Sequence, residues 1–287
     1  YVIGSSQGEE ALSSYFGRFN YSFDGKYLLT GTIRRDGSSR FTPDNRWGTF
    51  PSFSAGWNIA RESFFKVPSV SSLKLRAGWG QVGNQNSAGN YGYVTTVEPN
   101  NLYVFNNVAV GGSILTTLAN RNLRWETTEM TNAGIDAGLF DNRFNVTFDY
   151  FIKKTKDMII QVPLPSFTGA YAPRSNAGDV ENRGIELSLN YRNYDRALKF
   201  DAGLVFSKIT NEVVNLGGNP GLPGGAVNVS GDATFTQEGY EIAYFYGYKT
   251  DGIFNDQAEL DGYVNANGQK FQPDARLGDP KYIDLDG

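Results

Sequence analysis

The chain has 287 residues, 34 of them glycine and 14% aromatic, and its formal net charge is −4. It contains neither cysteine nor histidine, which excludes disulfides, thiolate nucleophiles, and catalytic triads or metal sites built on imidazole for this segment. The negative charge gives no cationic footprint for nucleic acid, and no apolar run approaches the ~18 residues that a membrane-spanning helix requires.

Alternation of apolar and polar residues with a period of two is the dominant signal along the chain. In "YFGRFNYSF", for example, Phe19 and Tyr21 share one parity while Arg18 and Asn20 share the other. In chain order, the pattern predicts strands over residues 15–23, 27–34, 53–59, 73–79, 133–139, 144–152, 185–191 and 198–206. The interruption over residues 82–120 is rich in Asn and Gly, so we expect a long loop there.

The connections between these strands alternate in length. "FDGK", "RESFFKVPS", "DN" and "NYDR" are short, whereas the arginine-rich loop, residues 82–120, "VPLPSFTGAYAPRSN" and the part after Asn211 are long. Strict alternation places all the long connections at one end of an up-and-down sheet, which is typical of outer-membrane barrels. A soluble β-sandwich with rings in its core is the alternative, although Greek-key crossovers mix long and short connections at both ends.

We therefore predict an all-β fold, a transmembrane antiparallel up-and-down β-barrel of which this chain supplies about eight to ten strands. One face of each strand would meet lipid, and aromatic rings would gather near strand ends at the headgroup level. The rings expected in this belt are Tyr21, Tyr27, Trp47, Phe50, Trp57 and Trp79.

Several long stretches make the prediction more specific. "NYSFDGKYLLTGTIRRDGSSRFTPDNRWGTFPSFSAGWNI" resembles the barrel signature of the SusC/RagA family of TonB-linked outer-membrane transporters of Bacteroidetes. The stretches "LKLRAGWGQVGNQN", "NLRWETTEMTNAGIDAGLFDNRFNVTFDYFIKKTKDMI", "NAGDVENRGIELSLNYR" and "YFYGYKTDGIF" resemble the same family in the same order, so that the resemblance covers nearly the whole chain.

The resemblance implies a barrel of about 22 strands with a plugged lumen in the outer membrane of a Gram-negative cell. It implies import of oligosaccharides or peptides driven by TonB, with a SusD-like surface lipoprotein as partner. Residues 1–287 would all belong to the barrel domain. Because the first residue is Tyr1 and the first methionine is Met130, we expect a piece of a longer protein, without the plug, the TonB-contacting segment or the last strands.

Substrate would first meet the long loops, where aromatic faces and planar polar side chains together suit sugar rings. The alternative is that these side chains pack on one another or on the lipoprotein. The candidates are Asn86, Asn90, Tyr91, Tyr93, Tyr103, Phe105, Asn106, Phe167, Tyr171 and Arg174.

Charged residues allow three further expectations. The arginines around "RRDGSSRF" either order their loop through salt bridges, which we favour because Asp36 and Asp44 lie among them, or attract an acidic ligand. The polar faces would line the plug-filled interior, with side chains solvated or paired with the plug. Asp284 and Asp286 resemble the start of an Asp-rich loop that could hold calcium, although a turn with solvated acids is the simpler interpretation. We expect no other cofactor.

Two other functions stay open at this point. A siderophore or cobalamin receptor would share the barrel, and the missing histidine disfavours a haem version. A soluble carbohydrate-binding β-sandwich would share the alternation. We do not expect an enzyme, because no pair of carboxylates is tied to a recognisable pocket motif.

Overall fold

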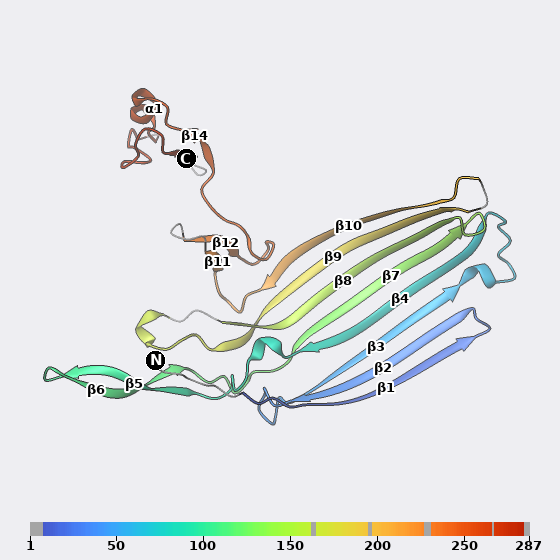
Figure 1. The fold of residues 1–287 in the computed structure, drawn as a ribbon, viewed down its shortest axis with the longest axis horizontal. Coiled ribbons are helices and arrows are strands. Elements are labelled where there is room, and N and C mark those ends of the chain that lie inside the picture. The colour runs from blue at the N-terminus through green and yellow to red at the C-terminus, as the bar shows by residue number, and fades with distance from the viewer. Residues whose placement is uncertain (1–7, 162–164, 195–196, 227–230, 266, 284–287) are drawn as a thin grey trace. The chain divides into compact units, whose positions relative to one another are not determined.

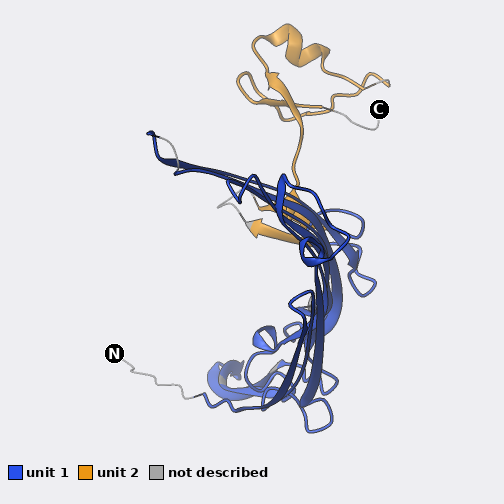
Figure 2. Ribbon diagram, turned by 90° about the vertical axis from the view of Figure 1, so that its right-hand side faces the viewer, with its two compact units in different colours: residues 1–221, 237–242 blue, residues 222–236, 243–287 orange. Residues whose placement is uncertain are grey.

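The computed structural model describes residues 8–161, 165–194, 197–226, 231–265 and 267–283. Two compact units are distinguished: residues 1–221 together with 237–242, and residues 222–236 together with 243–287 (Figure 2). The expectation that all 287 residues belong to one barrel domain stays a prediction.

The first unit is built on an eight-stranded sheet in which every neighbouring pair is antiparallel (Figure 1). Its strands are β1 (Leu12–Phe23), β2 (Tyr27–Ser38), β3 (Trp47–Asn58), β4 (Val70–Asn84), β7 (Glu126–Leu139), β8 (Phe144–Gln161), β9 (Arg174–Asn193) and β10 (Phe200–Asn215). Their order in the sheet follows the chain, as an up-and-down topology requires. All eight predicted strands are confirmed, and the strands are longer than the sequence pattern indicated. Strand β9, for instance, begins at Arg174, whereas the alternation of apolar and polar residues predicted a strand from residue 185 onward.

The register of the sheet separates two faces. Directly opposite residues of an antiparallel pair point to the same face. The pairs join bulky apolar residues strand after strand, and one such row runs through Tyr27, Trp57, Leu75, Ile135, Phe148, Leu187 and Phe206. Phe19 and Phe53, on the same face, are 65% and 61% exposed. A sandwich would bury these rings under a second layer, so the structure argues against that alternative and agrees with a face that meets lipid.

The sheet is an open segment. β1 and β10 are its two edges, and within the described residues they do not pair with each other. Figure 2 shows the sheet of the first unit bent into an arc. An arc of this kind with two free edges is a part of a barrel wall, because a closed barrel has no edge strands.

Most of the expected aromatic belt lies on the apolar face. Tyr27 stacks on Trp57, and Trp79 stacks on Phe53, with ring centroids 6.4 and 6.2 Å apart. Phe50 is an exception and corrects the prediction. It pairs with Arg34 in the register and is buried on the opposite, polar face. Successive side chains of a strand point to opposite faces, and in β3 the belt residues Trp47 and Trp57 have odd numbers whereas Phe50 has an even number. Phe50 therefore points to the face opposite the belt.

The connections gather by end as predicted, but their lengths do not alternate strictly. Residues 24–26, 59–69, 140–143 and 194–199 connect strands at one end, which we call the short-turn end, and residues 39–46, 85–125 and 162–173 connect them at the other, the long-loop end. The turn over 59–69, which contains the 3-10 helix η1 (Ile59–Arg61), is longer than the arginine-rich loop over 39–46.

The segment predicted as a long loop contains a hairpin. The 3-10 helix η2 (Asn86–Ala88) is followed by β5 (Thr96–Phe105) and β6 (Val108–Thr117), which pair with each other in a two-stranded sheet. The sequence pattern missed these strands because Leu102, Tyr103, Val104 and Phe105 are consecutive and give no alternation. A third 3-10 helix, η3 (Ser166–Thr168), lies in the loop before β9.

The second unit is small. It contains a three-stranded sheet of β11 (Leu222–Ala226), β12 (Asp232–Thr236) and β13 (Tyr244–Phe245), and a two-stranded sheet of β14 (Thr250–Ile253) and β15 (Pro280–Tyr282). Between the last two strands lies α1 (Gln257–Gly262), capped by the carboxylate of Asp256, which accepts a hydrogen bond from the backbone N–H of Glu259 at 2.8 Å. None of the helices in the described part of the chain has the length and apolar character to cross a membrane.

Candidate functional site

A buried apolar cluster joins the long connections where they leave the sheet. We call it the loop-base cluster, and its members are Phe41, Phe50, Ala88, Leu123, Trp125 and Ile159. They come from the arginine-rich loop, β3, η2, the segment before β7, and β8. The indole of Trp125 is central, with its ring centroid 5.3 Å from that of Phe41 and 5.5 Å from that of Phe50. Since these residues are buried, the bases of the loops form a packed unit.

Hydrogen bonds and glycines complete the packing of this cluster. Trp125 Nε1 donates to the backbone carbonyl of Arg46 at 3.0 Å, and Thr42 Oγ1 donates to the carbonyl of Arg121 at 3.2 Å. A Cβ at Gly83 would collide with the ring of Phe50, so the absence of a side chain there leaves room for the ring. The arginine-rich loop is therefore held against the segment before β7 by apolar contact and by directed bonds.

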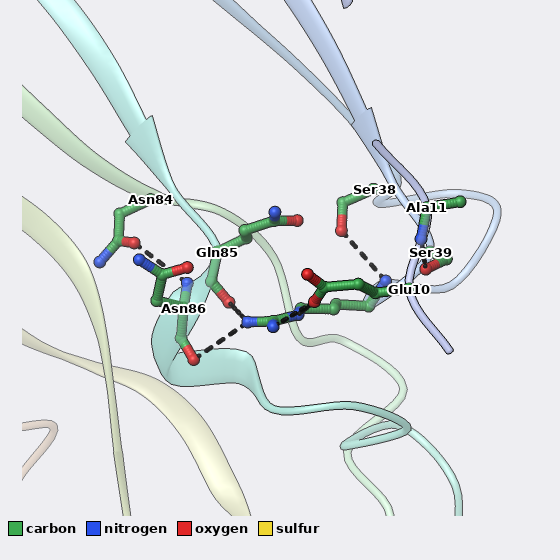
Figure 3. A network of polar contacts seen from close by, with 8 residues as sticks. Glu10, Ala11, Ser38, Ser39, Asn84, Gln85 and Asn86 are labelled. Atoms are coloured by element: carbon green, nitrogen blue, oxygen red, sulfur yellow. Dashed lines mark hydrogen bonds and ion pairs between the residues drawn. The ribbon is translucent and has the colours of Figure 1, made fainter. Parts of the chain in front are cut away.

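Two arginines donate hydrogen bonds to backbone carbonyls of the turn that contains the candidate residue Asn86. Arg40 Nη1 lies 3.3 Å from the carbonyl oxygens of both Gln85 and Asn86, and its guanidinium also pairs with Glu10 (Figure 3). The guanidinium of Arg174 also donates to this turn, at the carbonyl of Ser87. Each cation satisfies backbone acceptors that strand pairing leaves free.

Two arginines of β2, just before the loop, support the salt-bridge interpretation. Arg34 Nε lies 2.7 Å from Asp36 Oδ2, and the guanidinium of Arg35 lies over the ring of Trp47, 5.3 Å from its centroid. Cation–π contact and ion pairing both fix side chains that would otherwise sample many rotamers. The contacts thus show loop ordering, which was the favoured expectation.

The structure separates the ten predicted substrate residues into two groups. Asn86, Asn90, Tyr91, Tyr93 and Arg174 lie around η2 and the start of β9, near the loop-base cluster. Tyr91 has a left-handed backbone, with φ of 61°, and its side chain is half exposed.

The remaining candidates lie in the β5–β6 hairpin and in the loop before β9. Tyr103, Phe105 and Asn106 are at or beside the turn of the β5–β6 hairpin, the part furthest along the register from its base. Phe167 and Tyr171 lie in the loop before β9, and the backbone of Tyr171 bridges to Thr117. Phe167 is 87% exposed and Phe105 is 70% exposed. The predicted residues therefore lie in separate parts of the long loops.

Sequence reasoning missed the residues that organise the loops. Phe41, Leu123 and Trp125 lie in segments without alternation, so no periodic signal marks them as buried. Trp125 falls in "NLRWETT", one of the stretches that carried the family resemblance. Its role follows only from contacts between loops that are far apart along the chain.

The polar face of the sheet carries its own ion-pair network. Arg76 Nε lies 2.7 Å from Asp136 Oδ2, and Arg76 Nη2 lies 3.0 Å from Asp149 Oδ2. Thr147 Oγ1 also donates to Asp136, at 3.2 Å. Asp149 Oδ1 is buried without a hydrogen-bond partner among the described residues. The predicted charged lining is thus partly paired within the wall, and pairing with a plug stays a prediction.

A second polar network lies at the short-turn end. Glu62 Oε1 accepts hydrogen bonds from Tyr27 Oη at 2.7 Å and from Trp57 Nε1 at 3.0 Å, and Lys26 Nζ is 3.5 Å from Glu62 Oε2. The hydrogen bond from Tyr27, followed by that from Trp57, holds the pKa of Glu62 below the 4.5 of an unperturbed glutamate. This carboxylate therefore fixes two rings of the aromatic belt at the level expected for lipid headgroups.

No metal site emerges from the described part of the chain, where no cluster of three or more Asp or Glu side chains is arranged to hold an ion. Asp284 and Asp286 lie outside the described residues, so their calcium-binding role stays a prediction.

Comparison with known proteins places this geometry in a family. The family model described as "TonB dependent receptor-like, beta-barrel" matches residues 4–278. TonB-dependent receptor P3 of Formosa agariphila is 35% identical over 97% of this chain and 28% of its own length. TonB-dependent receptor SusC of Bacteroides thetaiotaomicron is 44% identical over 62% of this chain and 18% of its own length.

Solved structures agree with the sequence comparison. The structure of the RagAB peptide transporter matches with a TM-score of 0.76 and 30% identity, covering 90% of this chain and 28% of that one. The chain thus spans less than a third of the length of these relatives. From the match to the family model, the SusC and RagAB similarities and the open two-faced sheet, we conclude that the chain belongs to the TonB-dependent receptor β-barrel family, in its SusC/RagA branch.

Proposed function

We propose that the whole receptor imports oligosaccharides or peptides across the outer membrane, driven by TonB and assisted by a SusD-like surface lipoprotein. The observation that carries this proposal is the two-faced sheet, with polar side chains on one face in register across eight strands and packed loops at one end. Similarity to SusC and to the RagAB peptide transporter supports the class of cargo. The family is one of transporters and not of enzymes, so we propose no catalytic step.

Two residues near the loop base are proposed to meet the cargo. Tyr91 presents a half-exposed ring, and Arg174 supplies a guanidinium that donates to the carbonyl of Ser87 and lies next to Gly89, two residues before Tyr91. A ring face and a planar donor together suit either a sugar or a peptide backbone.

Uptake by the full-length receptor tests this function. In a strain that lacks the receptor gene, we expect wild type to restore uptake of either labelled oligosaccharides or labelled peptides, and Tyr91→Ala to reduce it about tenfold, a loss typical of one stacking contact. Phe140→Ala, an exposed ring at the short-turn end, is the matched control and leaves uptake unchanged. Failure of the wild-type receptor to restore uptake of either cargo would refute the proposed import.

The β5–β6 hairpin supports a partner at the surface. Its apolar side chains are exposed on both faces, as Leu102 and Tyr103 show with neighbouring positions in β5. An isolated two-stranded hairpin is marginally stable in water, so a ribbon with two apolar faces needs a covering protein. We propose that the lipoprotein supplies this cover.

Co-purification tests the role of the hairpin. We expect Leu102→Asp combined with Val104→Asp to reduce recovery of the lipoprotein with the full-length receptor, because charge is costly in an apolar interface. Thr234→Asp, a substitution outside the hairpin, is the control. Equal recovery with both variants would contradict the proposed contact.

A further inference from the structure

The apolar face of the sheet contains a groove of about 770 Å³ at a place that the proposed import does not use. Its floor is a row of three alanines on adjacent strands, Ala55, Ala77 and Ala133, which are direct partners in the register. Leu29 and Tyr150 continue the row on the strands to either side. Small side chains in the middle of a row with bulky ends produce a hollow in an otherwise filled surface.

Large side chains make the walls of this groove. On the side of the short turns the wall includes Trp57, Leu75 and Phe148, all of which line the hollow. The next row on the other side includes the stacked rings of Phe53 and Trp79. The row crosses five strands from β2 to β8, and at a spacing of about 4.8 Å this gives a length of roughly 19 Å. A groove of this length, bordered by large side chains on both sides, matches an extended fatty-acyl chain.

At its β2 corner, on the side of the short turns, the groove is bordered by polar groups. Tyr27 and Trp57, which line the hollow, both donate to the carboxylate of Glu62. Next to Glu62 in the chain is Arg61, whose guanidinium lies so close to the turn that a Cβ at Gly25 would collide with it. Arg61 is exposed, and within the described residues it makes no ion pair. Lys26, in the turn before Tyr27, pairs with Asp24 and Glu62. Arg61 thus adds a cation without an ion pair, among the described residues, beside the turn that leads into the groove-lining Tyr27, and a guanidinium suits a phosphate attached to acyl chains.

We propose that this groove binds one phospholipid of the periplasmic leaflet, with an acyl chain over the alanine row and its phosphate on Arg61. The proposal rests on the outer-membrane placement in the proposed function, in which short turns face the periplasm. A phospholipid is favoured over a second copy of the chain because the length of the hollow suits one acyl chain and because Arg61, which makes no ion pair within the described residues, lies near its β2 corner. A flat protein face would leave the alanine row unfilled, and unfilled space forfeits dispersion contacts.

Lipid retention by the full-length receptor tests the proposal. The receptor is extracted from the membrane fraction, exchanged into nanodiscs that contain palmitoyl-oleoyl-phosphatidylethanolamine, and released for native mass spectrometry. Ala133→Phe fills the groove, and Ala137→Phe is the matched control on the same strand and face, outside the lining. We expect wild type and Ala137→Phe to retain one phospholipid, and Ala133→Phe to retain it at least tenfold less. Arg61→Gln is expected to lower retention several-fold.

Each other outcome overturns the proposal. Equal retention by Ala133→Phe and Ala137→Phe would mean that lipid covers the face without a site. Retention of lipid A alone would exclude a periplasmic-leaflet phospholipid. Dissociation of a receptor dimer by Ala133→Phe, with no change in retained lipid, would assign the groove to a second copy. If Ala133→Phe does not fold, Arg61→Gln decides, because unchanged retention then refutes the site. Absence of wild type from the membrane fraction would refute the placement itself.

Discussion

Replacing Trp125 by alanine is the sharpest test of the idea that the loop bases form a packed unit. The side chain is 7% exposed, contacts the rings of Phe41 and Phe50, and donates a hydrogen bond to the carbonyl of Arg46. Deleting a buried tryptophan costs about 3–5 kcal/mol, which includes the cavity left behind. Since about 1.4 kcal/mol corresponds to a factor of ten, we expect local opening to become roughly 10²–10³ times more frequent.

Hydrogen–deuterium exchange on the full-length receptor in detergent measures this opening. We expect the amides of residues 39–46 and 120–125 to exchange faster by that factor, while the strands keep their protection. Trp125→Phe keeps most of the ring contact and loses the hydrogen bond, which is worth about 1 kcal/mol, so its effect should be about fivefold.

Trp79→Ala is the control for this experiment, because Trp79 stacks on the apolar face, away from the cluster. Unchanged exchange over residues 39–46 in Trp125→Ala, or equal effects of Trp125→Ala and Trp79→Ala, would refute the view that Trp125 holds the loops together.

Three further outcomes are expected. Arg76→Met removes the cation between Asp136 and Asp149 and should lower the free energy of unfolding by about 1–2 kcal/mol, a range reduced for solvent screening. Arg76→Lys should recover part of this loss, and unfolding titrations with guanidinium measure both variants. Gly83→Ala pushes a Cβ into the ring of Phe50 and should lower the free energy of unfolding by about 1–3 kcal/mol. At Gly17 the atom nearest to an added Cβ is 4.0 Å away, so Gly17→Ala should leave stability unchanged. Heat-dependent gel migration of the folded receptor compares the two variants. Because the folded-state pKa of Glu62 is lowered, its stabilising contribution is fully present above pH 4.5 and is lost as the pH falls through the folded-state pKa. Glu62→Gln should therefore weaken the pH dependence of Tm below pH 4.5, and an unchanged pH profile would contradict the network.

The sequence by itself determined the strands that cross the lipid layer. A face that meets hydrocarbon must be apolar while the opposite face need not be. Because successive side chains of a strand point to opposite faces, apolar and polar residues alternate along the sequence with a period of two. Phe19, Phe53 and Leu204 therefore signalled their strands and their face without knowledge of the partners. The up-and-down order of the strands groups the connections by end, and quoted stretches such as "NLRWETT" carry the family resemblance.

Only the tertiary structure decided how the loops are built. The sequence predicts Phe50 in the aromatic belt, yet it packs in the loop-base cluster with Trp125, because a residue's burial there depends on neighbours far along the chain. The hydrogen bonds from Arg40 to the carbonyls of residues 85 and 86, and the groove over the alanine row, likewise depend on residues that are far apart along the chain. Alternation reports which solvent each side chain meets, one residue at a time. Contacts between loops, and hollows between strands, depend on register and on packing across the sheet, which no local pattern encodes.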